Sequence, residues 1–276
     1  MGVGVAQVLA ETGHQVVLVD VDTKALARAR EEIDKGLKLS ALFNPQSRGA
    51  NRAQVLKAIA FATNLDGVAD VSFLIENVTE SPVIKEPLYR RLDEVCKPEC
   101  IFAANTSAIP IARLARSTSR PDRVIGLHFM NPVPRKEFVE VIVSEHTSQT
   151  TVALSLERLR LMNKKGLVVK DSPGFVSNRV LMLAINEAIA LVQEGVADAR
   201  GVDEIFVKCI GQKMGPLATA DLIGLDTVLK TLEFLHESYA AGKYSPSALL
   251  VSMVAKGRLG RKTGAGFFDY EGSSAR

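Results

Sequence analysis

The sequence has few of the features that mark disulfide-rich, metal-binding or membrane proteins. Its three cysteines are an odd number, and Cys96 and Cys100 of C-K-P-E-C have no second ligand pair or nearby histidine to complete a zinc site. No apolar run reaches the roughly 18–20 residues that cross a bilayer. The first residues contain neither the charged region nor the apolar region of a signal peptide. These absences predict a soluble, cytoplasmic protein without a metal site or a membrane partner.

Blocks of like charge are absent as well. The net charge is +3, and the 34 Lys and Arg residues are scattered along the chain, which argues against a nucleic-acid partner. Of the 276 residues, 47% are apolar and 24% are charged, as in ordinary soluble globular proteins. A chain of this length holds one large domain or two of common size.

The first two-thirds of the sequence alternates short β-branched runs with helical stretches. This pattern is typical of a parallel sheet with crossover helices, so we expect a Rossmann-type α/β domain. The expected strands are residues 15–19, 59–62, 71–78, 101–104, 124–127, 138–143 and 167–169, and the expected helices are residues 23–42, 83–96 and 111–117, with a loop at 44–51.

The composition changes at Asp171-Ser172-Pro173-Gly174. After this point the strand patterns cease, and helical patterns cover residues 175–193, 201–211 and 222–241. We therefore expect the α/β domain to comprise residues 1–171 and an all-α domain to comprise residues 172–276.

The N-terminal segment M-G-V-G-V-A leads into a helix and then into a strand that ends at Asp20. This order resembles the second part of a dinucleotide-binding βαβ unit, in which Gly2 would be the third glycine of G-x-G-x-x-G and the pyrophosphate would rest on the helix N-terminus. A carboxylate in the position of Asp20 binds both ribose hydroxyls of NAD and repels the extra phosphate of NADP. The alternative is a glycine-containing helix start followed by an unrelated aspartate.

His128 has the most informative surroundings of the four histidines, R-V-I-G-L-H-F-M-N-P-V-P. It follows a strand that should end at the carboxyl edge of the sheet, where open α/β folds bind ligands. Glu140 follows in the apolar strand F-V-E-V-I-V. A carboxylate bonded to an imidazole fixes its tautomer and raises its basicity, as the oxidation of a hydroxyl requires. The alternative is a histidine that caps a strand, together with a solvated glutamate.

Two further polar residues have both a functional and a structural interpretation. Ser107 follows the strand I-F-A-A and could donate a hydrogen bond to a substrate oxygen or to the nicotinamide carboxamide, but an N-T-S segment is also a common helix N-cap. Asn178, in D-S-P-G-F-V-S-N-R, would lie one turn into the second domain and could reach back to the cleft. Without that context it is an ordinary polar residue of a helix.

Together these segments resemble the L-3-hydroxyacyl-CoA dehydrogenase family, which includes the 3-hydroxybutyryl-CoA dehydrogenases. The resemblance runs from Met1 to Tyr270 in one register. Its most specific motifs are H-F-M-N-P-V-P with V-E-V-I, D-S-P-G-F-V-S-N-R, G-P-L-A-T-A-D-L-I-G-L-D and G-R-K-T-G-A-G-F-F-D-Y. Members of this family interconvert a 3-hydroxyacyl thioester and the 3-oxoacyl thioester.

The resemblance implies NAD as the cofactor, an acyl thioester as the substrate and a homodimer formed mostly by the helical domain. It implies that His128 is the general acid/base and that Glu140 orients it. Ser107 and Asn178 would bind the substrate oxygens and stabilise the transition state. The positions that match dinucleotide contacts of the family are Gly2, Asp20, Glu80, Lys85, Ser107, Asn131 and Lys262.

The sequence departs from the family pattern in two ways. The first strand and the first two glycines of the fingerprint are lacking, which predicts exposed sheet edges and a weak pyrophosphate site; a mis-set start codon or a trimmed clone is the expected cause. The serine and lysine that contact the CoA phosphate in the family correspond here to Gly36 and Phe43. This second departure favours a carrier other than CoA.

The segments H-F-M-N-P-V-P, N-T-S-A-I-P and I-E-N-V-T-E resemble a polyketide branch of the family. Its members oxidise glyceryl bound to an acyl carrier protein, on the route to hydroxymalonyl and methoxymalonyl extender units. Arg135 and Lys136 would suit an acidic carrier protein, or they are ordinary solvated surface. Two other hypotheses remain: a catalytically silent structural relative, and a Rossmann dehydrogenase of free β-hydroxyacids, which would use a lysine as its acid/base.

Overall fold

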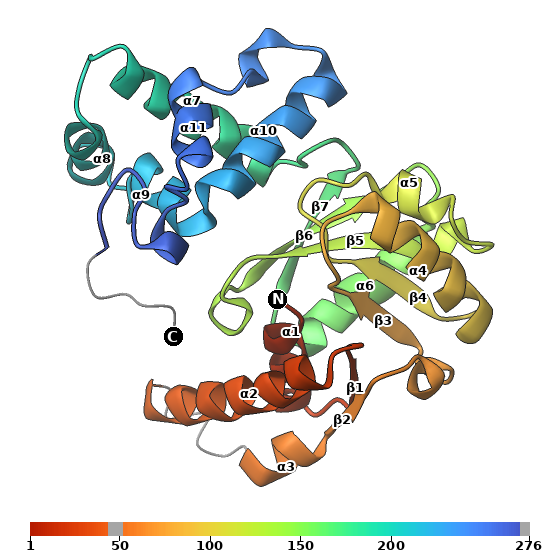
Figure 1. Cartoon of the computed structure of the whole chain (residues 1–276). Coiled ribbons are helices and arrows are strands. Elements are labelled where there is room, and N and C mark those ends of the chain that lie inside the picture. The colour runs from red at the N-terminus through yellow and green to blue at the C-terminus, as the bar shows by residue number, and fades with distance from the viewer. Residues whose placement is uncertain (44–51, 271–276) are drawn as a thin grey trace. The chain divides into compact units, whose positions relative to one another are not determined.

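The computed structural model describes residues 1–43 and 52–270, so the loop expected at 44–51 lies outside the described residues. The chain divides into two compact units, Met1–Ser172 and Pro173–Arg276, whose elements are labelled in Figure 1. The first unit is an α/β unit of Rossmann type and the second is helical, as expected.

Helices and strands alternate along the first unit. Its helices are α1 (Gly2–Glu11), α2 (Thr23–Phe43), α3 (Arg52–Lys57), α4 (Pro82–Val95), α5 (Ile111–Ala115) and α6 (Gln149–Leu161). Its strands are β1 (Val16–Val19), β2 (Ile59–Ala62), β3 (Phe73–Glu76), β4 (Ile101–Ala104), β5 (Val124–Phe129), β6 (Phe138–Val143) and β7 (Lys165–Lys170). Short 3₁₀ turns are η2 (Asp66–Val68), η3 (Pro121–Arg123) and η4 (Val133–Arg135). Every expected strand is present, whereas α3 and α6 were not expected.

The sequence pattern of α6 is obscured because β-branched threonines and a valine occupy its first turn, Q-T-T-V. The local signal for this helix is its N-cap. The hydroxyl of Ser148 accepts a hydrogen bond from the backbone N–H of Thr151 at 3.2 Å, which satisfies one of the free donors of the first turn.

The strands form two separate sheets, a pair β1-β2 and a five-stranded sheet in the order β3-β4-β5-β6-β7. Among the described residues, β1 pairs only with β2 and β3 only with β4, so each has an unpaired edge. The apolar side chains of β1 and β3 are only half-buried, whereas β4 and β5 are buried throughout. The exposed edges expected from the sequence are therefore present.

The five-stranded sheet is not parallel throughout. β5 and β6 run antiparallel, with His128 directly opposite Glu140, because the eight residues 130–137 that join them are too few for a crossover helix. β7 then runs parallel to β6. The expected end of β5 at residue 127 is also wrong, since the strand continues to Phe129 and His128 lies inside it.

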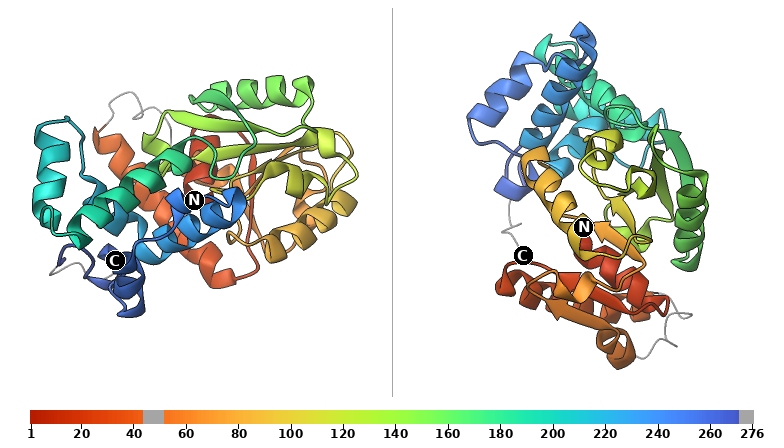
Figure 2. Two further views of the ribbon diagram at one scale, coloured as in Figure 1. Left: turned by 90° about the horizontal axis from the view of Figure 1, so that it is seen from above. Right: turned by 90° about the vertical axis from the view of Figure 1, so that its right-hand side faces the viewer.

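Helix α1 packs on both sheets. Its Val5 and Val8 join a core with the five-stranded sheet and α6, and its Ala6 and Ala10 join a core with α2, α3 and the two-stranded sheet. Figure 2 shows α6 and α4 on opposite faces of the five-stranded sheet. The N-terminus of α1 lies at the carboxyl edge of the strands, because a Cβ atom at Gly2 would be 3.4 Å from Cβ of Asn77, the residue after β3.

The second unit contains α7 (Ser177–Gln193), α8 (Ala199–Lys208), α9 (Pro216–Ile223), α10 (Leu225–Tyr239) and α11 (Ala248–Ala255), with the 3₁₀ turns η5 (Gly242–Tyr244) and η6 (Arg261–Thr263). The single helix expected at 222–241 is wrong at its start. Gly224 has a φ of 100°, a conformation that costs glycine little, and it separates α9 from α10. Within the described parts of the chain, every helix is too short or too polar to cross a membrane.

Candidate active site

His128 and Glu140 form the buried polar pair of the β5–β6 hairpin. Because the two residues face each other in the antiparallel register, their side chains project from the same face of the sheet. His128 Nδ1 lies 2.7 Å from Glu140 Oε2, and both residues are only 7% exposed. The carboxylate holds the hydrogen on Nδ1, so proton exchange falls to Nε2. The predicted contact is present, and the arrangement suits a general acid/base.

Ser107 lies in the loop after β4, and Glu80 holds that loop. Oε1 of Glu80 accepts hydrogen bonds from the Thr106 hydroxyl at 2.5 Å, from the Ser107 N–H at 2.8 Å and from the Ala108 N–H at 3.1 Å. The alternative that Ser107 is a helix N-cap is wrong, because α5 begins four residues later with Pro110 at its N-cap. The loop is therefore anchored through its backbone, and the exposed Ser107 is presented at the carboxyl edge of the sheet.

Lys85, in α4, forms a fully buried ion pair with Glu76 at the end of β3. Its Nζ lies 2.7 Å and 2.8 Å from the two carboxylate oxygens of Glu76 and 3.3 Å from the Val78 carbonyl. Glu80 Oε2 is further away, at 3.8 Å. Burial raises the pKa of Glu76, although the charge and hydrogen bond of Lys85 oppose this effect. Lys85 thus links Glu76 to Glu80, the residue that holds the Ser107 loop. The sequence match of Lys85 to a cofactor-binding position of the family did not indicate this role.

Gly2 and Asp20 occupy the positions expected from the second part of a dinucleotide-binding βαβ unit. Gly2 is the first residue of α1, and Asp20 follows β1 with an exposed carboxylate. The backbone N–H of Asp20 donates to the Ala62 carbonyl, and its Oδ1 accepts from the Asp22 N–H at 2.9 Å. A free helix N-terminus and an exposed carboxylate at the carboxyl ends of the strands are the groups that would take a pyrophosphate and a ribose.

Asn131 is exposed in the turn between β5 and η4, joined to Pro132 by a cis peptide bond. The turn is fixed from below by Lys164, whose ammonium donates to the carbonyls of Val133 and Lys136, each at 2.7 Å. Burial lowers the pKa of Lys164, with Glu11 and Glu137 acting in the opposite direction. No motif distinguishes Lys164 from a surface lysine, so its part in holding this turn could not be read from the sequence.

Asn178 and Lys262 belong to the second unit. Asn178 is the second residue of α7 and is half-buried. Lys262, in η6, makes an ion pair with Asp226 of α10 at 2.5 and 2.6 Å. Burial disfavours the ionised form of Asp226, but the hydrogen bond and charge of Lys262 outweigh it and hold the pKa of this carboxyl below its usual value.

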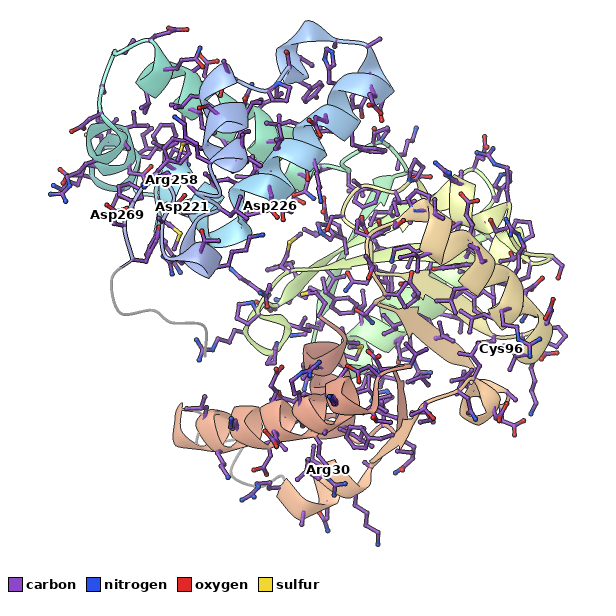
Figure 3. All side chains as sticks on the ribbon, in the orientation of Figure 1. Arg30, Cys96, Asp221, Asp226, Arg258 and Asp269 are labelled. Carbon is purple, nitrogen blue, oxygen red and sulfur yellow. The ribbon has the colours of Figure 1, made fainter. Side chains whose placement is uncertain are left out.

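The C-terminal motif G-R-K-T-G-A-G-F-F-D-Y has a structural explanation. The buried carboxylate of Asp221 accepts hydrogen bonds from the backbone N–H groups of Phe267 and Phe268 at 2.9 and 3.0 Å. A Cβ atom at Gly260 or Gly266 would collide with Asp221, so only glycine permits this approach. Arg258 closes the turn through the Gly266 carbonyl at 2.6 Å (Figure 3). The motif therefore folds residues 260–270 onto α9.

Gly36, one of the two departures from the family's CoA contacts, lies against α1. A Cβ atom at this position would be 2.5 Å from Oε1 of the buried Gln7, so a serine would require Gln7 to move. Phe43 ends α2, and its side chain lies outside the described residues.

The predicted site residues thus fall into three groups. His128 contacts Glu140, and Glu80 contacts Ser107 and approaches Lys85, all within the first unit. Gly2, Asp20 and Asn131 are at strand or helix ends of the same unit. Asn178 and Lys262 are in the second unit. Glu76 was missed, although a carboxylate that ends the apolar strand F-L-I-E, nine residues before a lysine, is a usable signal of a buried pair.

Comparison with known proteins covers nearly the whole chain. Residues 1–172 match the family model "3-hydroxyacyl-CoA dehydrogenase, NAD binding domain", and residues 174–270 match "3-hydroxyacyl-CoA dehydrogenase, C-terminal domain". A "probable 3-hydroxybutyryl-CoA dehydrogenase" of Deinococcus radiodurans is 44% identical over 98% of this chain and 96% of its own length. The 3-hydroxybutyryl-CoA dehydrogenase of Clostridioides difficile is 40% identical, with the same coverage of both chains.

A solved structure gives the same result. The crystal structure of (S)-3-hydroxybutyryl-CoA dehydrogenase from Ralstonia eutropha superimposes with a TM-score of 0.92 at 39% identity, covering 98% of this chain and 95% of that one. Matches in both units, at this identity and over this length, leave one assignment: the chain belongs to the 3-hydroxyacyl-CoA dehydrogenase family.

Proposed function

We propose that this protein interconverts a 3-hydroxyacyl thioester and the corresponding 3-oxoacyl thioester with NAD, and that a short-chain CoA ester such as 3-hydroxybutyryl-CoA is a substrate. The observation that carries the proposal is the buried His128–Glu140 pair, with Nδ1 and Oε2 2.7 Å apart. The names of the related enzymes supply the substrate class.

The residues that match the family's catalytic and substrate-binding positions are assigned the following roles. Nε2 of His128 takes the proton of the 3-hydroxyl during oxidation, and Glu140 stabilises the imidazolium that results. The hydroxyl of Ser107 and the amide of Asn178 donate hydrogen bonds to the substrate oxygens, which accumulate negative charge in the transition state. When bound, NAD supplies the hydride acceptor at C4 of the nicotinamide.

The groups that would hold NAD fit its chemistry. The N-terminus of α1 at Gly2 offers free N–H groups to the pyrophosphate, and the exposed Asp20 offers a carboxylate to the ribose hydroxyls while repelling a 2′-phosphate. Asn131 and Lys262 are two further polar groups that match dinucleotide contacts of the family. Glu80 and Lys85 serve chiefly through the loop that carries Ser107, since Glu80 Oε1 already holds three donors of that loop.

The primary test is NADH formation from 3-hydroxybutyryl-CoA, followed by absorbance, with NADP in place of NAD as the cofactor control. We expect turnover with NAD and at least about tenfold lower kcat/KM with NADP, because Asp20 repels the additional phosphate. A second substrate, glyceryl bound to an acyl carrier protein, tests whether the enzyme prefers CoA or a carrier protein as the thioester carrier. Two features favour the carrier protein. Gly36, packed against Gln7, replaces a serine that contacts CoA in the family, and Arg135 and Lys136 are exposed cations. A clear preference for the CoA ester would refute the hypothesis of a carrier-protein substrate.

A matched control separates an enzyme from a catalytically silent relative. The same assay is also run with a variant extended ahead of Met1 by an apolar strand that ends in G-x-G, which could pair with the edges of β1 and β3. Turnover by either protein supports the proposed function. Absence of turnover by both, with NAD still bound, would refute it and favour the silent relative.

Glu140→Ala is expected to lower kcat by about 10²-fold, because the imidazole of His128 loses the carboxylate at 2.7 Å that fixes its tautomer and stabilises the imidazolium formed during oxidation. The measurement is kcat for 3-hydroxybutyryl-CoA oxidation, with Glu140→Gln as the variant that keeps an acceptor without the charge. An unchanged kcat in both variants would mean that the pair does not support the proton transfer.

We also propose a homodimer formed by the second unit. Large apolar side chains that are more than half exposed stand on or beside its helices: Val176, Val180, Val196, Ile205, Ile210 and Leu222. A second copy of this unit would cover such surface. We expect light scattering to give about 60 kDa, twice the 29.8 kDa of the chain, and Val180→Asp with Val196→Asp to lower it. A mass near 30 kDa for the unsubstituted protein would contradict the dimer.

A further inference from the structure

Asn105 is the first residue after β4, at the place where the backbone ladder between β4 and β5 stops. The last backbone pair of these strands is Ala104 with Gly126. β5 nevertheless continues through His128 to Phe129, and over this stretch its named strand partner is β6 alone. The segment of β5 that carries His128 therefore has no backbone pair with β4.

The side chain of Asn105 fills this gap. Its Oδ1 accepts a hydrogen bond from the backbone N–H of Phe129 at 3.1 Å, and its Nδ2 donates to Oδ1 of Asn77 at 2.7 Å. Asn77 stands after β3, and its own Nδ2 donates to the Ile75 carbonyl at 3.0 Å. The backbone N–H of Asn105 donates to the Glu76 carbonyl at 2.9 Å. One amide therefore joins the ends of three neighbouring strands, β3, β4 and β5, which lie side by side in Figure 1.

The chain of bonds fixes the orientation of both amides. Each amide has one donor and one acceptor engaged, from Phe129 N–H through Asn105 and Asn77 to the Ile75 carbonyl. Phe129 is only 2% exposed, so water cannot replace Asn105 as the hydrogen-bond acceptor of its N–H if the asparagine side chain is removed. An alanine at 105 would leave a buried donor unsatisfied next to His128, and the backbone there would have to move.

We propose that Asn105 is a positioning residue that holds the peptide between His128 and Phe129 at a set distance from the loop carrying Ser107. Asn105 is bonded to that peptide and is two residues before Ser107, so one side chain sets the spacing of the proton acceptor and the hydroxyl donor. This inference rests on the proposed function. It assigns no contact with substrate or cofactor to Asn105.

The kinetic test compares Asn105→Ala, Asn77→Ala and the double variant in the 3-hydroxybutyryl-CoA assay. Because displacements near 1 Å cost large rate factors, we expect Asn105→Ala to lower kcat by about 10–100-fold. KM for both substrates should stay within about threefold, since ground-state binding is not involved. Asn77 acts through Asn105, so Asn77→Ala should cost less, and the double variant should lose no more than about twofold beyond Asn105→Ala.

Asn186 is the matched control. Its amide likewise bridges two partners, in this case both backbone groups, donating to the Ser245 carbonyl at 2.9 Å and accepting from the Ser247 N–H at 3.0 Å, wholly within the second unit. Asn186→Ala should lower the melting temperature without changing kcat more than about twofold. Two results would overturn the proposal. One is a kcat of Asn105→Ala within about twofold of the unsubstituted protein. The other is a double variant whose fold-loss in kcat equals the product of the losses of the two single variants.

A spectroscopic measurement separates this inference from the proposed function. With ¹⁵N-labelled histidine, the hydrogen shared by His128 Nδ1 and Glu140 should give a strongly deshielded proton resonance, identified by its loss in Glu140→Ala. We expect it to shift or broaden in Asn105→Ala and to remain in Asn186→Ala. An unchanged resonance in Asn105→Ala would refute the positioning role. If the unsubstituted protein shows the expected resonance behaviour but no turnover, the proposed function fails while the positioning role stands.

Discussion

Replacing His128 with asparagine is expected to lower kcat for 3-hydroxybutyryl-CoA oxidation by about 10²–10⁴-fold, the usual contribution of a general acid/base. Asparagine can keep a hydrogen bond to Glu140 and preserve much of the volume, but it cannot take up the hydroxyl proton. NAD binding should be little affected, because the groups assigned to the dinucleotide lie on α1, after β1, in the turn after β5 and in η6. KM for NAD should therefore remain close to that of the unsubstituted protein.

The chain contains a matched control for this substitution. His146 also contacts a glutamate, with Nε2 3.5 Å from Oε1 of Glu145, but in a polar segment after β6. His146→Asn removes a histidine–carboxylate contact without touching the β5–β6 hairpin, and kcat should stay within about twofold. A loss of turnover in His128→Asn that is absent in His146→Asn would attribute the proton transfer to this one imidazole.

The opposite result would change the class of mechanism. If His128→Asn keeps activity within about tenfold, the histidine is not the base, and the alternative of a free β-hydroxyacid dehydrogenase with a lysine base gains support. Lys85 and Lys164 are poor candidates for such a base. The first is bonded to Glu76 and the Val78 carbonyl, and the second to the carbonyls of Val133 and Lys136.

The contact between His128 and Glu140 could be predicted because the two strands carry the information locally. In V-I-G-L-H-F and F-V-E-V-I-V, the polar residue of each strand occupies the face opposite the large apolar residues that enter the core with α6. A short link between two such strands predicts an antiparallel pair, which brings the two polar residues to one face. The helices between the other strands dominate the pattern, so the alternation by itself predicts a parallel sheet and does not indicate this antiparallel pair.

The bonds of Asn105 and Lys85 could not be predicted in the same way. The β4–β5 pairing stops at Ala104 and Gly126, an end point that the sequence does not indicate, and an asparagine after a strand is otherwise an ordinary turn residue. Lys85 matched a position that contacts the dinucleotide in the family, which hid the possibility that its ammonium is buried against Glu76. Both interactions join residues on different elements. The sequence carries a signal only for Lys85, the carboxylate that ends F-L-I-E nine residues earlier, whereas the two side-chain partners of Asn105 lie 24 and 28 residues away.

Lys85→Met is expected to destabilise the protein by about 3–5 kcal/mol, because it leaves the carboxylate of Glu76 buried without its partner. The side chains of Lys85 and Glu76 are 0% and 1% exposed, so water cannot replace the lost interactions. For a domain of this size, the loss corresponds to a melting temperature lower by roughly 10 °C. Urea unfolding followed by circular dichroism measures the change.

The double variant Glu76→Gln with Lys85→Met distinguishes a buried ion pair from a merely well-packed lysine. Glutamine retains an acceptor for the Val78 N–H, which bonds to Glu76 Oε1 at 2.5 Å, and carries no charge. Replacing both partners of a buried pair is often close to neutral, so the double variant should recover most of the stability that Lys85→Met loses. Arg91→Met, which breaks the exposed Arg91–Glu94 pair of the same helix, should cost less than about 1 kcal/mol.

These variants also decide how Lys85 serves the site. A direct contact with the dinucleotide predicts that Lys85→Met raises KM for NAD while unfolding hardly changes. A buried link between Glu76 and the Glu80–Ser107 loop predicts a large loss of stability, largely restored in the double variant, together with a lower kcat from a loosened Ser107. We expect the second outcome, since the Lys85 ammonium is 2.7–2.8 Å from both oxygens of Glu76. Stability within about 1 kcal/mol of the unsubstituted protein would refute it.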